Sequence, residues 1–215
     1  MKKNIVCISE NAFMSILISA IESYPSRFMG ERKPNNSTAE GEVFGLLFGQ
    51  KSEKPDSTIY NVALAIPTQI LMLKNHFTVE PSIKHLEKVR EIIETFPMYQ
   101  YLGSYHSHPF HREEFFEGDS VIASDADVSY ALWDSSCIEA EAIMAIIGLT
   151  YLTKKLTNVS PKSEWYYIQN YCGKYKYNLG AHVTERENNS LKVVDNLLCP
   201  FAFGINNCDL NSTKR

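Results

Sequence analysis

The stretch Ser104-Tyr105-His106-Ser107-His108-Pro109 is the most informative part of the 215-residue chain. It lies at the end of residues 99–108, whose composition predicts a β-strand. Side chains in a strand alternate between its two faces, so His106 and His108 point to the same face and can converge on one metal ion. We expect Pro109 to stop the strand and to leave that end of the site open.

A catalytic zinc site takes three protein ligands and keeps a fourth position for water. Downstream, Ser124-Asp125-Ala126-Asp127 opens a predicted helix over residues 125–133. Asp127 is therefore a candidate third ligand, with Ser124 one helical turn earlier on the same side. Upstream, Glu42 precedes the apolar residues 43–49, which predict a buried strand. A glutamate in this position packs poorly and is suited to carry a proton.

Each of these pieces, taken alone, has an ordinary structural interpretation. An isolated H-x-H is more often a surface pair than a ligand pair, and Glu42 alone would be an exposed strand end. Ser124 with Asp127 is also a start like a capping box for the predicted helix. Four further histidines have no partner in the sequence and are expected at the surface: His76, His85, His111 and His182. The joint occurrence of the pieces, in this order, favours a site.

In combination, the segments resemble the JAMM motif of the MPN metallopeptidase superfamily. That motif has a glutamate in a Gly- and Leu-rich strand, then H-[ST]-H-P, a spacer and S-x-x-D, and the match covers roughly residues 40–150. The resemblance implies an α/β (α+β) fold, an MPN/JAB-like mixed sheet flanked by helices with a cytidine-deaminase-like architecture. It further implies a bacterial-type, single-domain JAMM/MPN-plus member with a C-terminal extension.

The spacer departs from the family pattern, because residues 110–123 separate Pro109 from Ser124. At the shorter spacing usual in the family, the serine and aspartate positions would hold Glu117 and Ser120. We therefore interpret residues 110–123 as containing an insertion and keep Asp127 as the ligand, with Asp119 and Asp125 as alternatives. This 110–123 insertion is acidic and carries exposed aromatics, so it is either a tolerated surface loop or a lid beside the metal.

The resemblance also implies roles for the motif residues. His106, His108 and Asp127 would hold Zn²⁺, Glu42 would carry the proton from water to the departing amine, and Ser124 would donate a hydrogen bond to the oxyanion. Ser107 points to the opposite face of the strand from the histidines, so we assign it a packing or hydrogen-bonding role.

The substrate that the resemblance implies is an isopeptide or peptide bond after the C-terminal tail of ubiquitin or a ubiquitin-like protein. Processing of a sulfur-carrier precursor is an alternative. A catalytically silent MPN scaffold is another, although the retained ligand set argues against it. The DNA-repair-associated branch of the superfamily fits less well, because Phe110 and His111 follow the proline here.

The composition argues against a nucleic-acid partner, a membrane span and a disulfide framework. Lys and Arg number 21 against 25 Asp and Glu, a net charge of −4, which argues against a nucleic-acid partner. No apolar run reaches the ~20 residues that span a membrane, and residues 12–21 fit an amphipathic helix better than a signal peptide. Five cysteines without a C-x-x-C pair favour reduced thiols and a cytoplasmic protein over a disulfide framework or zinc ribbon.

The remaining elements complete a mixed order. We expect strands over residues 4–8, 59–66 and 142–149, a helix from Pro81 to Pro97, and polar loops over 31–39 and 51–58. Tyrosines around Gly173-Lys174 predict a hairpin, and residues 206–215 a frayed tail. We therefore expect a metallopeptidase core over residues 1–155 and an aromatic-rich extension over 156–215 that packs on it.

Overall fold

The structure is a computed structural model that describes residues 2–30, 40–68, 71–74, 79–116, 118–138, 140–156, 159–185 and 187–204. Its helices are α1 (Glu10–Glu22), α2 (Ile83–Glu94), α3 (Asp125–Ile138) and α4 (Pro200–Gly204), with short 3₁₀ turns η1 (Ser26–Met29), η2 (Arg112–Glu114) and η3 (Asp119–Val121). Its strands are β1 (Lys3–Ile8), β2 (Phe44–Glu53), β3 (Ser57–Pro67), β4 (Leu71–Lys74), β5 (Val79–Pro81), β6 (Gln100–Phe110), β7 (Ile143–Tyr151), β8 (Lys162–Ser163), β9 (Tyr167–Cys172), β10 (Tyr175–Glu185), β11 (Ser190–Val193) and β12 (Asn196–Leu198). The fold is mixed α/β.

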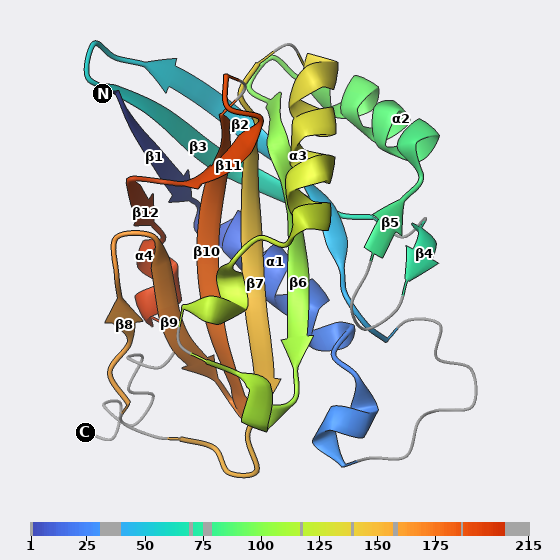
Figure 1. The fold of residues 1–215 in the computed structure, drawn as a ribbon, viewed down its shortest axis with the longest axis vertical. Helices are drawn as coiled ribbons and strands as arrows, with labels where there is room; N and C mark the ends of the chain where they lie inside the picture. The colour runs from blue at the N-terminus through green and yellow to red at the C-terminus, as the bar shows by residue number, and fades with distance from the viewer. Residues whose placement is uncertain are drawn as a thin grey trace, which may run out of the picture.

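One curled, mixed sheet forms the centre of the molecule (Figure 1). Its strand order is β12-β1-β3-β2-β6-β7-β10-β9-β8, with β11 paired to β10, while β4 and β5 form a separate two-stranded sheet. The β6–β7 pair is parallel and central, and the β2–β6 and β7–β10 pairs that flank it are antiparallel. The predicted strand over residues 142–149 is confirmed as β7, which is buried on both faces as its continuous apolar sequence requires.

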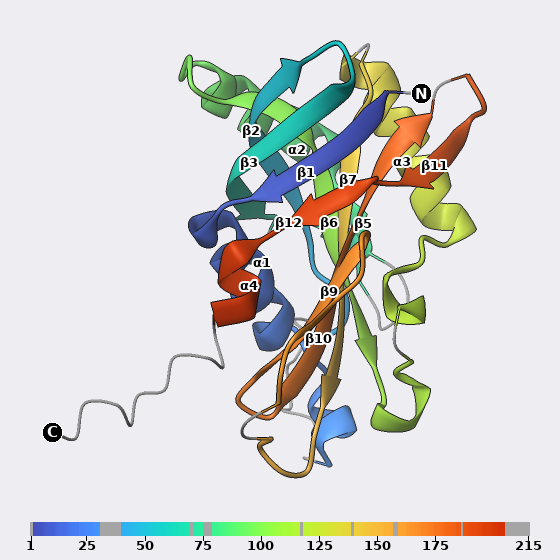
Figure 2. The ribbon, with the colours of Figure 1, turned by 90° about the vertical axis from the view of Figure 1, so that its left-hand side faces the viewer.

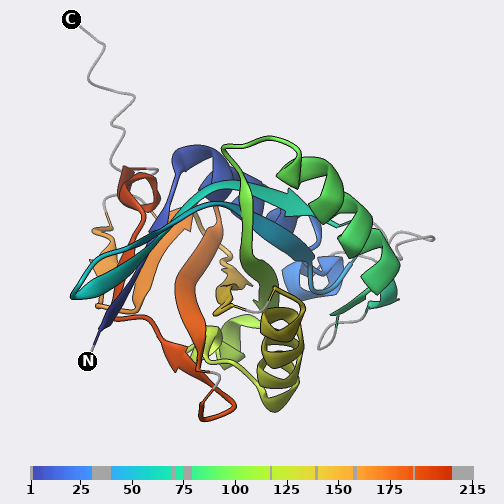
Figure 3. The ribbon, with the colours of Figure 1, turned by 90° about the horizontal axis from the view of Figure 1, so that it is seen from above.

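Helices cover both faces of this sheet. The α1 and α4 helices lie on one side and α3 on the other, as Figures 2 and 3 show in two directions. The side chains of β7 alternate between the two faces of the sheet. Ala145 and Ile147 pack in the larger core with α1. Met144 and Ile146 pack on the other face with Ala131 of α3. The α2 helix buries Leu86 in a third cluster over β2.

The predicted helix in residues 12–21 is confirmed as α1. Its N-cap is Ser9, whose hydroxyl accepts a hydrogen bond from the Ala12 amide at 3.3 Å. Phe13, Ile16 and Leu17 form its buried face. Among the described residues, no helix is both long enough and apolar enough to cross a membrane.

The C-terminal part of the chain joins the same sheet. The predicted tyrosine hairpin is confirmed as β9–β10, which turns at Gly173 with φ of 61°. Strand β10 pairs with β7, and β12 pairs in parallel with β1 at the other edge. The expected boundary near residue 155 therefore does not divide the sheet, and residues such as Tyr177 and Leu179 belong to the main core.

Two local expectations are wrong, and one pair of strands was not expected. Residues 51–58 are mostly strand, because β2 continues to Glu53 and β3 starts at Ser57. Pro81 ends β5 and does not open α2, whose first residue is Ile83. The antiparallel β4–β5 pair was not expected. The predicted loop over 31–39 and the predicted tail over 206–215 lie outside the described residues.

Candidate metal centre

Strand β6 places His106 and His108 on the face of the sheet that α3 covers. Tyr105 points the other way into the core with α1, as the alternation predicts. His106 lies opposite Phe44 of β2 and Ile146 of β7. It is 2% exposed, whereas His108 is half-buried.

Pro109 does not stop β6, contrary to expectation. Strand β2 starts at Phe44, which lies opposite His106. The last backbone hydrogen bond from β6 toward β2 is made by the Ser107 amide, which donates to the Val43 carbonyl at 3.0 Å. Two residues further, the nitrogen of Pro109 faces the same side beyond the end of β2, so its missing N–H costs no ladder bond. β6 continues along β7 to Phe110.

Asp127 reaches the histidines from the first turn of α3. Its Oδ2 atom accepts hydrogen bonds from the Ser124 amide and from the Ser124 hydroxyl, both at 2.7 Å. In return, the Asp127 amide donates to the Ser124 hydroxyl oxygen at 3.3 Å. The capping interpretation of Ser124 thus holds, and the same bonds fix the Asp127 carboxylate. The Oδ1 atom of Asp127 lies toward His106 on the sheet.

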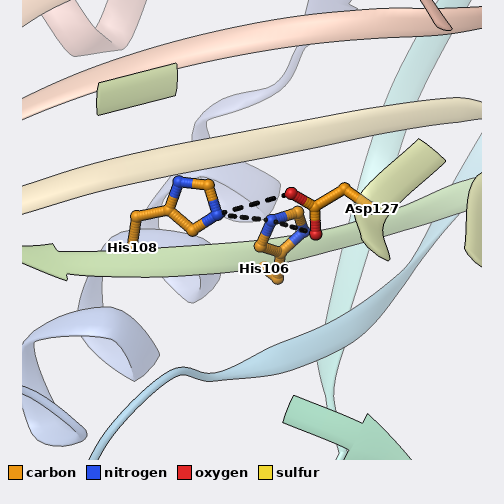
Figure 4. Close-up of side chains that lie close together, drawn as sticks. All are labelled: His106, His108 and Asp127. Carbon is orange, nitrogen blue, oxygen red and sulfur yellow. Dashed lines mark hydrogen bonds and ion pairs between the residues drawn. The ribbon is translucent and has the colours of Figure 1, made fainter. Parts of the chain in front are cut away.

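The three side chains form one tight group (Figure 4). The His106 Nε2 atom lies 2.9 Å from His108 Nε2 and 3.1 Å from Asp127 Oδ1, and His108 Nε2 lies 3.7 Å from Asp127 Oδ2. Ligands of a tetrahedral zinc ion with bonds of about 2.0–2.1 Å stand roughly 3.3 Å apart, so the observed separations bracket the requirement. Two imidazoles and one carboxylate are also a suitable donor set, and the group could hold a metal ion.

The electrostatics of the group suit a cation. Burial lowers the pKa of His106 and so favours the neutral imidazole that a metal needs. Burial opposes the charged form of Asp127, but hydrogen bonds from both histidines outweigh it and hold the pKa of this carboxyl well below its usual range. Burial also opposes protonation of His108, yet Asp127 and Glu42 raise the pKa of that imidazole. The Asp127 carboxylate therefore brings a negative charge to the group.

Glu42 lies beside this group, just before β2. It is 7% exposed, and burial raises the pKa of its carboxyl to about 7. The next residue, Val43, is fixed to β6 because its amide donates to the Ser107 hydroxyl at 2.9 Å. The expected hydrogen-bonding role of Ser107 is thus confirmed, and its effect is to hold the backbone that carries Glu42.

The 110–123 insertion divides into two parts. Its first half, around η2, is exposed, although Phe115 packs edge-to-face against Phe110 and beneath the ammonium of Lys176. In its second half, Ser120 and Val121 of η3 are buried against β7 and β10. There the Ser120 carbonyl lies 3.3 Å from Nδ1 of His108. Sequence reasoning missed this contact, since nothing in the local pattern distinguishes Ser120 from its neighbours.

The alternative ligands lie elsewhere. Asp119 and Asp125 are exposed, and within the described part of the chain the metal-competent group contains only His106, His108 and Asp127.

The surface assignment of His182 is wrong. His182 lies on β10 with 5% exposure, and burial lowers the pKa of its imidazole to about 4. It therefore contributes a neutral ring to the buried layer close to the group. His111 is exposed and His85 half-buried, whereas His76 lies outside the described residues.

The chain matches no protein-family model and no curated protein sequence. Assignment of a function to this site therefore rests on its residues and geometry.

Proposed function

We propose that the protein is a zinc-dependent peptidase or isopeptidase of the JAMM/MPN type. The observation that carries this proposal is the convergence of His106, His108 and Asp127 on one point, with the buried carboxyl of Glu42 beside them. The order of the motif along the chain and the mixed sheet between helices support the same family, with its MPN/JAB-like, cytidine-deaminase-like architecture.

His106, His108 and Asp127 would hold the zinc ion. When bound, zinc supplies Lewis-acid polarisation of the scissile carbonyl and lowers the pKa of water. Glu42 then accepts a proton from the attacking water and returns it to the departing amine, so one carboxyl acts first as base and then as acid.

Ser124 is the proposed donor to the oxyanion that forms on the substrate. Its side chain is exposed at the start of α3, so substrate can reach it. In the structure its hydroxyl donates to Asp127. During the reaction that hydroxyl would turn to the developing negative charge, while the Ser124 amide continues to hold the carboxylate in place.

The proposed substrate is a ubiquitin or ubiquitin-like conjugate, cleaved after the extended C-terminal tail, in the cytoplasm. An extended tail binds naturally by adding a strand to a sheet edge. The β4–β5 pair, which stands apart from the main sheet between β3 and α2, is a suitable place for such an addition.

Cleavage assays test this proposal. Zinc-loaded protein is incubated with isopeptide-linked diubiquitin and with fusions of ubiquitin-like and sulfur-carrier proteins to a C-terminal peptide. Wild type should cleave at least one of them, and Glu42→Gln should bind zinc as wild type does yet lose on the order of 10²- to 10⁴-fold in rate. Glu53→Gln, an exposed carboxylate paired with Lys2, is the matched control and should cleave normally. Equal rates for wild type and Glu42→Gln would remove Glu42 from the mechanism, and no cleavage of any substrate would contradict the proposed activity.

A further inference from the structure

A chain of buried polar groups runs behind His108, away from the metal-facing side. It begins at the Ser120 carbonyl, 3.3 Å from Nδ1 of His108, and continues from the Ser120 hydroxyl to the amide of Asn178, 2.8 Å away. Asn178 is on β10 and Gln169 on β9, and these two side chains and Ser120 are at most 1% exposed. These polar groups thus link the C-terminal hairpin to His108, which lies more than sixty residues earlier in the sequence.

The neighbours of Asn178 fix the orientation of its amide. In one assignment only, its oxygen accepts from the Gly118 amide at 3.3 Å and from the Ser120 hydroxyl at 2.8 Å. Its nitrogen then donates to Oε1 of Gln169 at 3.3 Å and to the Tyr177 carbonyl at 3.1 Å. Each polar atom of the amide therefore has a partner, as a fully buried amide requires.

The η3 turn packs so closely against the sheet that it can occupy only one position. A Cβ atom on Gly148 of β7 would lie 2.5 Å from the side chain of Ser120. A Cβ atom on Gly180 of β10 would lie 2.7 Å from the side chain of Val121. The turn therefore rests directly on the bare backbone of both strands, and Gly118, with φ of 81°, provides the bend that starts it.

We propose that Asn178 and Ser120 are positioning residues for the metal centre. Asn178 holds η3, and the Ser120 carbonyl accepts the Nδ1–H of His108, which fixes the ring orientation and leaves the Nε2 lone pair for the metal. The inference rests on the proposed zinc site. It assigns part of the site to the 110–123 insertion and to the C-terminal hairpin, neither of which the motif includes.

Zinc affinity of the full-length protein tests this inference. The zinc dissociation constant is measured by competition with a chelator for wild type, Asn178→Leu and Ser120→Ala, together with the melting temperature of each metal-free protein. Outer-shell partners of zinc ligands affect affinity by about 10- to 100-fold, and we expect losses in that range for both variants. Because the two residues act through one contact, the double variant should bind about as weakly as the weaker single variant.

Thr184→Val is the matched control for a purely structural effect. Thr184 is also on β10, is 1% exposed, and accepts a hydrogen bond from the Ala142 amide at 2.9 Å. This variant should melt at a lower temperature and still bind zinc like wild type.

The outcomes separate the inference from the proposed function. Tight zinc binding by wild type with unchanged affinity in Asn178→Leu and Ser120→Ala would overturn the positioning role and leave the zinc site standing. Failure of folded wild type to bind zinc would contradict the zinc site itself. If Asn178→Leu does not fold, Ser120→Ala decides, since it removes one hydroxyl and no backbone atom. Equal weakening in Thr184→Val would also overturn the inference, because the effect would then be general to β10.

Discussion

At the scale of single residues, the candidate site depends on how Glu42 is held. The Val43 amide donates to the Ser107 hydroxyl, and the Ser107 amide donates to the Val43 carbonyl. This reciprocal pair extends the contact between β2 and β6 by one residue past Phe44. It holds the backbone next to Glu42, which lies outside the strand ladder and beside the metal group.

Replacing Ser107 by alanine tests this support. The Val43 amide would lose its buried partner, at a cost of about 1–3 kcal/mol in the free energy of unfolding. Glu42 would lose part of its positioning, so cleavage should slow while zinc content stays that of wild type. Denaturant unfolding, metal analysis and the cleavage assay measure the three quantities.

Ser104→Ala is the matched control for this prediction. Ser104 is on the same strand and as deeply buried, but within the described residues its hydroxyl has no hydrogen-bond partner. Its removal should leave stability unchanged or slightly increased. A larger loss for Ser104→Ala than for Ser107→Ala would contradict the assigned role of Ser107.

At the scale of elements, the site requires α3 to keep one position over β6. The Tyr101 hydroxyl of β6 donates to Asp134 of α3 at 2.6 Å, and the Arg90 guanidinium of α2 lies 4.2 Å from the centre of the Tyr101 ring. Three elements thus meet at one buried phenol. This contact fixes the helix whose first turn carries Asp127.

The burial of Asp134 predicts a pH dependence of stability. Burial raises the pKa of Asp134 to about 6 in the folded protein, against an ordinary value of 3.8. The folded state therefore binds the proton more tightly, so the contribution of this group is full below pH 3.8 and is lost as pH rises through about 6. Two pKa units correspond to about 3 kcal/mol.

Asp134→Asn should remove this dependence while keeping an acceptor for Tyr101. The difference in unfolding free energy between Asp134→Asn and wild type should grow in favour of the variant as pH rises from 4 to 7. Asp56→Asn, at an exposed position, is the control substitution. A constant difference across this range for Asp134→Asn would be inconsistent with the raised pKa.

At the scale of the whole molecule, the C-terminal strands belong to the main sheet, and one of them, β10, lies in its interior. β10 lies between β7 and β9, and its residues Tyr177, Leu179 and Val183 are fully buried in the core with α1. A chain of residues 1–155 would lack these side chains, so it would expose the edge of β7 and the apolar core residues that they cover. We predict that this fragment shows no cooperative thermal unfolding by circular dichroism, and that adding a fragment of residues 156–215 restores it. Cooperative melting of residues 1–155 alone would contradict this prediction.

Sequence reasoning found the parts of the fold that have a local cause. Residues 142–149 form a long apolar run, α1 has a periodic apolar face, and the tyrosine hairpin has a glycine at its turn. The short β4–β5 pair has no such signal, and the strand character of residues 51–58 comes from pairing between β2 and β3. Pro109 shows the same limit, because its place inside β6 depends on where β2 starts.

The site was predictable to a similar extent. Alternation brings His106 and His108 to one face, and helical spacing brings Asp127 next to Ser124. The choice of Asp127 as the third ligand came from the resemblance to the JAMM motif. Ser120, Asn178 and His182 reach the group only through the order of strands β6, β7 and β10. That order is a property of the folded sheet, and no spacing along the chain encodes it.

The central claim is that His106, His108 and Asp127 form a zinc site, and metal content tests it most directly. Wild type, His106→Ala/His108→Ala and the control His85→Ala are expressed with zinc, dialysed against a weak chelator and analysed for metal per folded chain. We predict about one zinc per chain for wild type and for His85→Ala, and none for the double variant. Folded wild-type protein without zinc, or zinc retained by the double variant, would contradict the account.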